Sequence, residues 1–340
     1  MNNYCDTRRI LNKAQIKKSS ALINKVLGNP AKYFKFTIDG LSMTIPLESE
    51  DVRSLKCLPA LIESETEFTV IAKTHSHKEV KTTRFFNQIQ IINNEGHSFS
   101  LFYSSMMNSE MNKKKWEHKK TYNEGKIDVN VNTFGVDNTK IILSLVKKLW
   151  PAYDDLIARS RITVLDYTAD IPKMFTPHLI TTYAYRSLYR GFVKDGLFTG
   201  HQYGLKAQCP IKVYDKSAEQ EGQYLRYTDY TRFEKTYRPA IRGNKKILIS
   251  ALETADFNFR GLRYYDPKLL IGMPDHVLHL LLEHGLDSGK CMLSTKDSIN
   301  LKRRMDKHLI KLNKAQRFEI RDGLKSQLTN LKDLLLHPDS

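Results

Sequence analysis

Three short segments of this chain hold the residue types that can transfer a phosphodiester group. They are Val164–Asp170, Lys212–Glu219 and Tyr230–Arg238. Each alternates apolar and polar residues, which is typical of a β-strand with one face on a core and the other open. In the second segment, the polar face would carry Lys212, Tyr214 and Lys216. This face therefore offers a candidate nucleophile and two supporting cations.

The other two segments add carboxylates and an arginine. Alternation places Asp166 and Asp170 on one face of the first strand. It places Arg232 and Glu234 on one face of the third. Glu219 follows the regular part of the second strand, so alternation does not assign it a face. If the three polar faces lie side by side, a tyrosine, two lysines, an arginine and several carboxylates converge.

The carboxylates predict a metal site. Carboxylate oxygens are hard ligands that suit Mg²⁺ or Mn²⁺. We expect Asp166 and Glu234 to bind the metal, with Asp170 and Glu219 as further ligands. A metal held there would polarise and orient the scissile phosphate.

Tyr214 is the expected nucleophile. A tyrosine hydroxyl has an ordinary pKa of about 10 and attacks weakly, so it needs a metal, a lysine or a general base beside it. Lys216 or Lys212 would serve here or offset charge on the phosphate, and Arg232 adds a cation. Taken alone, the spacing Tyr214-x-Lys216-x-x-Glu219 is a weak motif, because such residues often form only cross-strand pairs.

The charge balance favours a polyanionic partner. The chain has 340 residues, with 54 Lys and Arg against 37 Asp and Glu, and a formal net charge of +17. An excess this large suits nucleic acid or an anionic membrane surface. Because the excess is spread along the chain and interleaved with 17 tyrosines, we favour nucleic acid.

Cysteine spacing and hydropathy argue against several classes of protein. The four cysteines form no CxxC pair, which disfavours a zinc ribbon or a disulfide scaffold and fits a reducing cytoplasm. The N-terminus has no apolar signal segment and no apolar run approaches about 18 residues, so we expect a cytoplasmic protein without a membrane partner. The chain also lacks a Walker A motif, so we expect a partner helicase to supply ATP hydrolysis.

Hydrophobic periodicity predicts an α+β fold with a mainly antiparallel sheet and flanking helices. Helices are expected at 7–27, 138–149, 176–188, 275–284, 294–310 and 314–336. Strands are expected at 33–45 (turning at Asp39-Gly40), 68–73, 85–92, 98–103, 127–132, 161–169, 210–214 and 230–237. The predicted regions are a basic N-terminal helix over 1–30, an α+β catalytic and DNA-binding domain over 31–250 with its core at about 85–240, and a helical C-terminal region over 251–340.

Two further segments are weaker candidates. Residues 106–126 are highly charged, and Lys113-Lys-Lys-Trp116 within them combines phosphate-binding cations with a ring that can stack on a base. His75-Ser76-His77 has the spacing of a paired-histidine metal motif, but its middle residue is polar where that motif has an apolar one.

The ordered set Asp166, Tyr214-Asp-Lys216-Ser-Ala-Glu219 and Arg232-Phe233-Glu234 resembles the rolling-circle replication initiators of filamentous phages, the gene II product and Cri-type replication proteins. The resemblance covers roughly residues 85–240. It implies a Rep-type nicking fold and an endonuclease that cuts one strand at a replication origin in the bacterial cytoplasm. It also implies that Tyr214 stays on the 5′ end as a phosphotyrosyl link, that a 3′-OH primer is freed, and that the displaced strand is later rejoined. Asp166 and Glu234 would lie around the metal.

The chain departs from that family at two points. The family often has an arginine two residues before the aspartate, where this chain has Val164, so a phosphate-binding role is not carried over to that position. Related plasmid initiators place their tyrosine upstream of the Tyr-x-Lys segment. This makes Tyr203, in Gly200-His-Gln-Tyr203-Gly204, a rival nucleophile to Tyr214.

Other functions stay open beside this one. A non-catalytic, sequence-specific DNA-binding regulator would also account for the charge and the basic terminal helices. An RNA-binding sheet of RRM type ranks last, because the aromatic RNP signature is missing. An oligomer is compatible with each of these functions.

Overall fold

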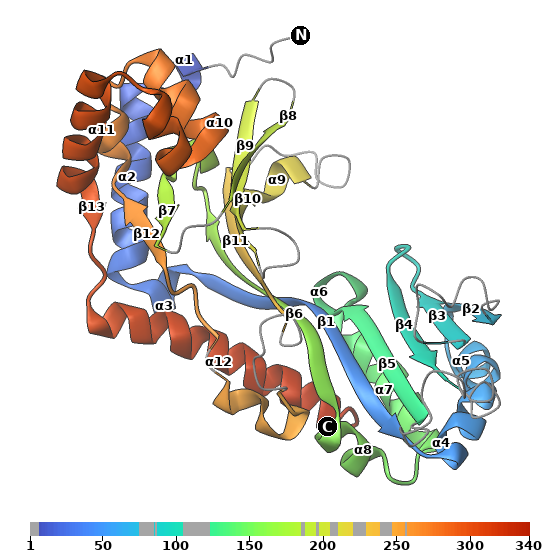
Figure 1. The fold of residues 1–340 in the computed structure, drawn as a ribbon. Helices are drawn as coiled ribbons and strands as arrows, with labels where there is room; N and C mark the ends of the chain where they lie inside the picture. Colours follow the sequence, from blue (N-terminus) through green and yellow to red (C-terminus); the bar gives the residue numbers. More distant parts are fainter. Residues whose placement is uncertain are drawn as a thin grey trace, which may run out of the picture. The chain divides into compact units, whose positions relative to one another are not determined.

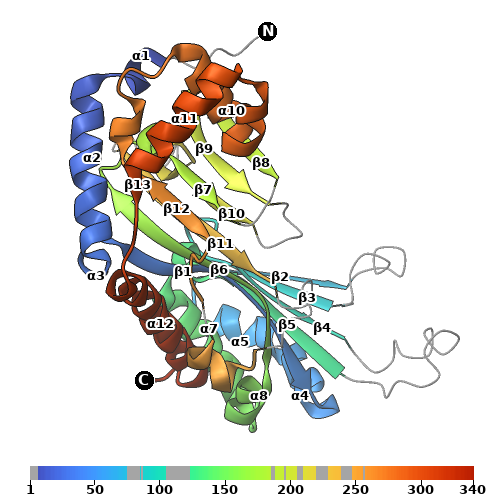
Figure 2. The same ribbon diagram turned by 60° about the vertical axis from the view of Figure 1, so that its left-hand side comes forward.

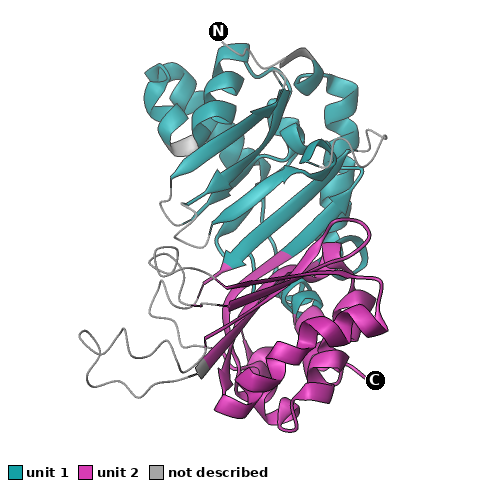
Figure 3. Ribbon diagram, turned by 90° about the vertical axis from the view of Figure 1, so that its right-hand side faces the viewer, with its two compact units in different colours: residues 1–36, 168–236, 256–324 teal, residues 37–167, 237–255, 325–340 magenta. Residues whose placement is uncertain are grey.

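The computed structural model divides the chain into two compact units that each combine distant segments (Figure 3). Unit 1 comprises residues 1–36, 168–236 and 256–324, and unit 2 comprises residues 37–167, 237–255 and 325–340. The structure describes residues 7–74, 85, 87–104, 123–184, 188–194, 197–204, 210–219, 229–238, 247–255 and 257–340. The sequence suggested three consecutive regions, whereas both units draw on the beginning, the middle and the end of the chain.

Unit 2 is built on an antiparallel sheet. Its strands follow the order β2 (Thr69–Thr74), β3 (Asn87–Ile92), β4 (Ser98–Tyr103), β5 (Asn123–Asn130), β1 (Lys35–Leu47) and the first half of β6 (Arg161–Pro172). Its helical elements are α4 (Ser49–Ser54), η1 (Leu55–Cys57), α5 (Leu58–Glu65), α6 (Val131–Phe134), α7 (Val136–Leu149), α8 (Tyr153–Arg159) and η7 (Ile249–Thr254). Helix α7 lies along this sheet and packs against α5 (Figure 1).

Unit 1 holds the second half of β6 and a run of antiparallel strands beside it. The order is β6, β11 (Tyr230–Tyr237), β10 (Ile211–Asp215), β9 (Leu197–Tyr203) and β8 (Tyr189–Lys194). A small separate sheet has the order β13 (Leu309–Ile310), β12 (Leu262–Tyr265) and β7 (Thr181–Tyr183).

Helices α2, α10 and α11 gather on one side of strands β8–β11 in unit 1 (Figures 1 and 2). The helical elements of this unit are α1 (Thr7–Ile10), α2 (Lys13–Gly28), α3 (Pro30–Tyr33), η4 (Thr176–His178), α9 (Lys216–Glu219), η8 (Pro267–Leu270), α10 (Asp275–Met292), α11 (Thr295–His308) and the first part of α12 (Lys314–Leu336). Among the described residues, no helix combines the length and the apolar character needed to cross a membrane.

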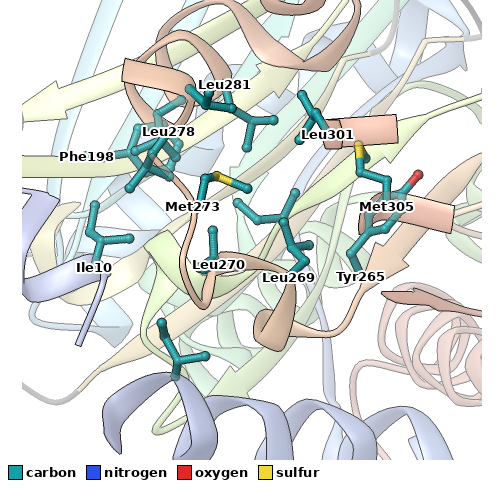
Figure 4. Close-up of a cluster of buried hydrophobic side chains, with 14 of the residues drawn as sticks. Ile10, Phe198, Tyr265, Leu269, Leu270, Met273, Leu278, Leu281, Leu301 and Met305 are labelled. Carbon is teal, nitrogen blue, oxygen red and sulfur yellow. The ribbon is translucent and has the colours of Figure 1, made fainter. Parts of the chain in front are cut away.

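A cluster of buried apolar side chains joins these helices to the sheet (Figure 4). Phe198 of β9 lies in it together with Leu278 and Leu281 of α10, Leu269 of η8 and Leu301 of α11. Each fully buried side chain of this size contributes about 1.5–3 kcal/mol relative to leaving it exposed. One face of β8–β11 is therefore committed to the core, which leaves chemistry to the other face.

Local signals in the sequence explain several elements. The strands predicted at 85–92 and 98–103 are confirmed as β3 and β4, which pair as a hairpin, and its turn closes because Asn93 Oδ1 accepts hydrogen bonds from the N–H groups of Glu95 and His97. Asn12 caps α2, and Ser294, at the start of the helix predicted over 294–310, caps α11. The coarse class, an α+β fold with a large antiparallel sheet and flanking helices, is confirmed.

The hairpin predicted at 33–45 is wrong. Residues Lys35–Leu47 form one continuous strand, β1, which pairs with β5 from Gly40 onward. Gly40 is needed for close approach rather than for a turn, because a Cβ there would lie 2.8 Å from the Asp166 carboxylate.

The helix predicted at 176–188 is also wrong. Thr176–His178 makes a single 3₁₀ turn, and Thr181–Tyr183 then pairs with β12. The side-chain hydroxyl of Thr176 contacts the Thr231 hydroxyl at 2.8 Å. The β-branched residues Thr181 and Thr182 favour the strand that follows. Strands β8, β9, β12 and β13 are not foreseen by the sequence patterns.

Candidate functional site

Strand pairing in unit 1 brings the second and third predicted segments together. In the antiparallel register of β10 and β11, Lys212 opposes Glu234 and Tyr214 opposes Arg232. Directly opposed residues share a face of the sheet. The intervening Ile211 and Val213 are buried on the other face, as alternation predicts.

Tyr214 and Lys212 meet at one carboxylate. The Tyr214 hydroxyl donates to Glu234 Oε2 at 2.9 Å, and the Lys212 ammonium donates to Glu234 Oε1 at 2.5 Å. Tyr214 is only 7% exposed, whereas the Lys212 side chain is 34% exposed. A phenol, a carboxylate and an ammonium therefore form one hydrogen-bonded chain that reaches solvent at its lysine end.

The surroundings hold the Tyr214 phenol in its neutral form. Burial, together with the negative charges of Glu234 and Glu219, raises the pKa of Tyr214 well above its ordinary value. The Arg232 guanidinium acts in the opposite direction and lowers that pKa by less. Attack by this hydroxyl therefore requires that its proton leave as the new bond forms.

Asp170 and Arg232 form a buried ion pair beside this chain. Arg232 donates from Nε to Asp170 Oδ1 and from a terminal nitrogen to Oδ2, both at 2.7 Å. The Tyr230 hydroxyl also donates to Asp170, at 3.1 Å. The exposed fractions are 5% for the Arg232 side chain and 3% for that of Asp170. This two-point geometry fixes the guanidinium plane next to Tyr214.

Lys216 and Glu219 do not continue the strand face. Strand β10 ends at Asp215, whose carboxylate accepts the N–H groups of Ser217 and Ala218 and so turns the chain into α9. Lys216 then pairs with Glu219 on that short helix. The prediction that Lys216 shares a strand face with Tyr214 is therefore wrong.

Asp166 belongs to unit 2, while the other predicted site residues belong to unit 1. Its side chain lies against the backbone of Gly40 on β1, within the same unit. Within unit 1, the structure thus brings Tyr214, Lys212 and Glu234 together and pairs Asp170 with Arg232.

The carboxylates of unit 1 do not fit a preformed metal centre. Three donors already occupy Asp170, which argues against its predicted role as a ligand. Glu234 accepts two donors, although a carboxylate offers about four acceptor positions. Among the residues that the structure describes, no three His, Cys, Asp or Glu side chains cluster as metal ligands.

Tyr203, the rival nucleophile, lies on the opposite face of the sheet. It opposes Ile211 in the β9–β10 register, and Tyr214 opposes Gly200. The Tyr203 hydroxyl donates to the Thr181 carbonyl at 2.6 Å, and the Thr181 hydroxyl contacts His201 Nε2 at 2.8 Å. This hydroxyl is therefore part of the buried packing of unit 1.

Register also adds polar residues that sequence reasoning missed. Arg190 opposes Gln202, and Gln202 opposes Lys212, so one row of polar side chains crosses β8, β9, β10 and β11 to Glu234. The alternation in Gly200-His-Gln-Tyr203 indicates that Gln202 and Tyr203 point to opposite faces, but only the strand register shows that Gln202 shares the face of Lys212. The segments 106–126 and His75–His77 fall outside the described residues, apart from 123–126, which belong to β5.

Gly200 permits the close backbone approach at Tyr214. Its φ is +150°, and a Cβ at this position would lie 2.4 Å from the Val213 carbonyl oxygen and 2.5 Å from the Tyr214 Cα. Only glycine fits this contact without moving β10.

Comparison with known proteins does not assign this arrangement. Neither a protein-family model nor a curated protein matches the chain.

Proposed function

We propose that this chain is a rolling-circle replication initiator that nicks one DNA strand at an origin and later rejoins it, with Tyr214 as the nucleophile. The observation that carries the proposal is the 2.9 Å hydrogen bond from the Tyr214 hydroxyl to Glu234. A tyrosine paired with a general base, and a base paired with a cation, is the arrangement that an activated nucleophile needs.

In the proposed step, Tyr214 Oη attacks the phosphorus of the scissile phosphodiester. The Oη–P bond forms, the bond from phosphorus to the 3′ oxygen breaks, and Glu234 accepts the phenolic proton. The 3′ oxygen leaves and takes a proton from solvent. The products are a 5′-phosphotyrosyl link and a free 3′-OH, and the reverse reaction rejoins the strand.

The neighbouring cations have separate tasks. Lys212 is partly exposed and contacts Glu234, so it is placed to offset negative charge on the phosphate. Arg232 is held by Asp170 beside Tyr214 and acts as a positioning residue. Arg190 and Gln202 extend the same face and provide further contacts for a DNA backbone.

Metal dependence is a separate part of the proposal. Glu234 supplies hard oxygen atoms with acceptor positions left over, and Mg²⁺ or Mn²⁺ recruited there together with a DNA phosphate would add Lewis-acid chemistry. Nicking assayed with Mg²⁺, with Mn²⁺ and with EDTA tests this part. Full nicking activity in EDTA would reject the metal requirement but would not affect the proposal that Tyr214 is the nucleophile.

The central test uses a supercoiled plasmid that carries the DNA flanking the coding sequence of this chain. The parent protein should convert the plasmid to the open-circular form and leave a protein–DNA adduct that survives SDS. Tyr214→Phe should abolish both. Nicking without any covalent adduct would contradict the mechanism, and undiminished nicking by Tyr214→Phe would contradict the choice of nucleophile.

A non-catalytic DNA-binding regulator is the second candidate. It is favoured by the burial of Tyr214 and by the saturation of Asp170 by Arg232 and Tyr230. This function predicts salt-sensitive binding to DNA and no strand cleavage with either metal.

A further inference from the structure

Unit 1 contains a concave site bordered by β12, β13 and the start of α12. Its volume is 760 Å³, within the range of about 300–1,000 Å³ that is typical of ligand sites. The lining comes from three segments that are far apart in the sequence, namely Ala184, residues 258–264 and residues within 309–321. We call this site the β12–α12 groove.

The groove is strongly basic. Arg260, Arg263, Lys311 and Arg317 line it, and all four side chains are exposed. Within the part of the chain that the structure describes, no ion pair neutralises any of these four. Arg321 also lines the groove but pairs with Asp322. None of the described lining residues is an aspartate or a glutamate. A concave surface with four such cations attracts a polyanion.

An exposed aromatic ring also lines the groove, next to two further cations. Phe318 is 38% exposed although it is large and apolar. The Arg321 guanidinium lies 4.5 Å from the centre of its ring, and the Lys314 ammonium lies 5.5 Å from it. An exposed ring between cations is the combination by which proteins hold single strands, since the ring stacks on a base and the cations contact phosphates.

The groove and the Tyr214 site use opposite faces of the same strand. Phe233 lies between Arg232 and Glu234 on β11, so its side chain points away from the Tyr214 site. Its ring packs against Phe259 and Tyr264, which both line the groove, with ring centres 6.1 and 5.9 Å apart. The groove is therefore a separate surface, and not an extension of the Tyr214 site.

We propose that the β12–α12 groove binds single-stranded DNA. Cations without carboxylates select a phosphate backbone, and stacking on Phe318 requires a base that is not already stacked in a duplex. This goes beyond the proposed nicking reaction, because it assigns a second DNA site that does not depend on Tyr214 chemistry.

The test measures binding of a fluorescent oligothymidylate of about 12 nucleotides, within the range of roughly 4–16 nucleotides for one single-strand site. Arg263→Gln/Arg317→Gln should weaken binding and reduce the magnitude of the slope of log K against log salt by about 1.4, because each phosphate contact contributes about 0.7. Phe318→Ala should weaken binding at least about fivefold, the lower end for losing one stacked base.

A matched control removes the same charge elsewhere in unit 1. Lys18→Gln/Lys302→Gln takes two exposed lysines from α2 and α11, neither of which lines the groove. Equal weakening by both double variants would overturn the proposal, because it would show a diffuse charge effect. Unchanged binding by Phe318→Ala would overturn it as well.

Photocrosslinking locates the bound strand directly. An oligothymidylate with one 5-iododeoxyuridine should crosslink to Phe318 or to its neighbours in residues 309–321, and the adduct is mapped by mass spectrometry. Crosslinks confined to β8–β11 would contradict the groove. Tyr214→Phe should give the same crosslinks as the parent protein, because the groove does not depend on the nucleophile. If the parent protein binds DNA in the groove but does not nick it, only the replication function is rejected. If the parent protein nicks DNA and the groove variants bind the oligothymidylate as tightly as the parent, only the groove proposal is rejected.

Discussion

Tyr203 and Tyr214 lie on adjacent strands but on opposite faces of one sheet, because Tyr203 opposes Ile211 and Tyr214 opposes Gly200. A phosphate bound at the polar face can contact the Tyr214 site but not the Tyr203 hydroxyl, which donates to Thr181 in the buried packing of unit 1.

Tyr203→Phe should therefore keep DNA nicking within about twofold of the parent, whereas Tyr214→Phe should lose at least about 10³-fold. Tyr203→Phe should instead lower the free energy of unfolding by about 1–3 kcal/mol, because the buried Thr181 carbonyl loses its donor. Nicking rates and urea denaturation check the two effects. Loss of the covalent adduct in a folded Tyr203→Phe variant would exchange the roles of the two tyrosines.

Glu234→Gln tests the general base. Glutamine keeps the shape and can still accept a hydrogen bond from Tyr214, but it cannot take the phenolic proton. Nicking should fall by about 10²–10⁴-fold, the usual range for a positioned acid or base. Single-turnover nicking on a preformed protein–DNA complex separates this from binding. Glu283→Gln is the matched control, since that carboxylate is exposed on α10 and pairs with His284, and it should retain most activity.

Asp170→Asn tests the buried ion pair. The substitution removes the charge that the buried Arg232 guanidinium contacts at two points, which should lower the free energy of unfolding by about 3–5 kcal/mol. The double variant Asp170→Leu/Arg232→Met should recover most of that loss, as apolar replacements of buried pairs often do. Asp155→Asn, in the exposed pair with Arg159, should change little. Chemical denaturation of the four proteins gives the comparison, and an Asp170→Asn protein as stable as the parent would contradict the pairing.

The burial of His201 should make the free energy of unfolding depend on pH. Burial lowers the pKa of His201 to about 3, compared with about 6.5 for an unfolded histidine. Below pH 6.5 the unfolded chain therefore binds a proton that the folded chain does not. The free energy of unfolding should fall with decreasing pH, by about 1.4 kcal/mol per unit for this group.

The measurement compares the parent with His201→Asn by urea denaturation between pH 7 and pH 5. The variant should show the shallower decrease, whatever its absolute stability. His178, whose pKa burial lowers to about 4, acts in the same direction in both proteins and cancels in the difference. Parallel curves would show that His201 titrates alike in the folded and unfolded chains, and would contradict the prediction.

Gly200→Ala tests the close approach at Tyr214. The added Cβ would meet the Val213 carbonyl and the Tyr214 backbone, and the φ of +150° is itself unfavourable for alanine. We expect a loss of stability of at least about 1–3 kcal/mol and a fall in nicking as β10 shifts. Gly28→Ala is the control, because a Cβ there meets nothing within 4 Å. A Gly200→Ala protein with unchanged stability and nicking would contradict the need for glycine.

Local patterns were sufficient for part of the fold. The period of two placed Lys212 with Tyr214 and Arg232 with Glu234, because successive side chains on any strand point to opposite faces. The cap at Ser294 and the turn at Asn93 are also local features, because their hydrogen bonds reach only a few residues along the chain.

Other elements depended on partners far away in the sequence. Residues 176–188 carry apolar spacing that suits a helix, yet Thr182 lies opposite Arg263 in a sheet. Asp39-Gly40 is a favoured turn sequence, yet Gly40 opposes Asn130 inside a continuous strand. In both cases tertiary pairing outweighs local preference, because a strand gains its hydrogen bonds only from another strand.

The sequence by itself determined which residue types were available and which of them share a strand face: a tyrosine with Lys212, a carboxylate with Arg232, and a large excess of positive charge. Only the tertiary structure decided that Tyr214 meets Glu234, that Asp170 is paired with Arg232, and that Tyr203 faces the core. It also decided that residues 258–264 and 309–321 enclose a basic groove. The physical reason is that alternation sets a face within one strand, while the register between strands is set by the packing of the whole unit.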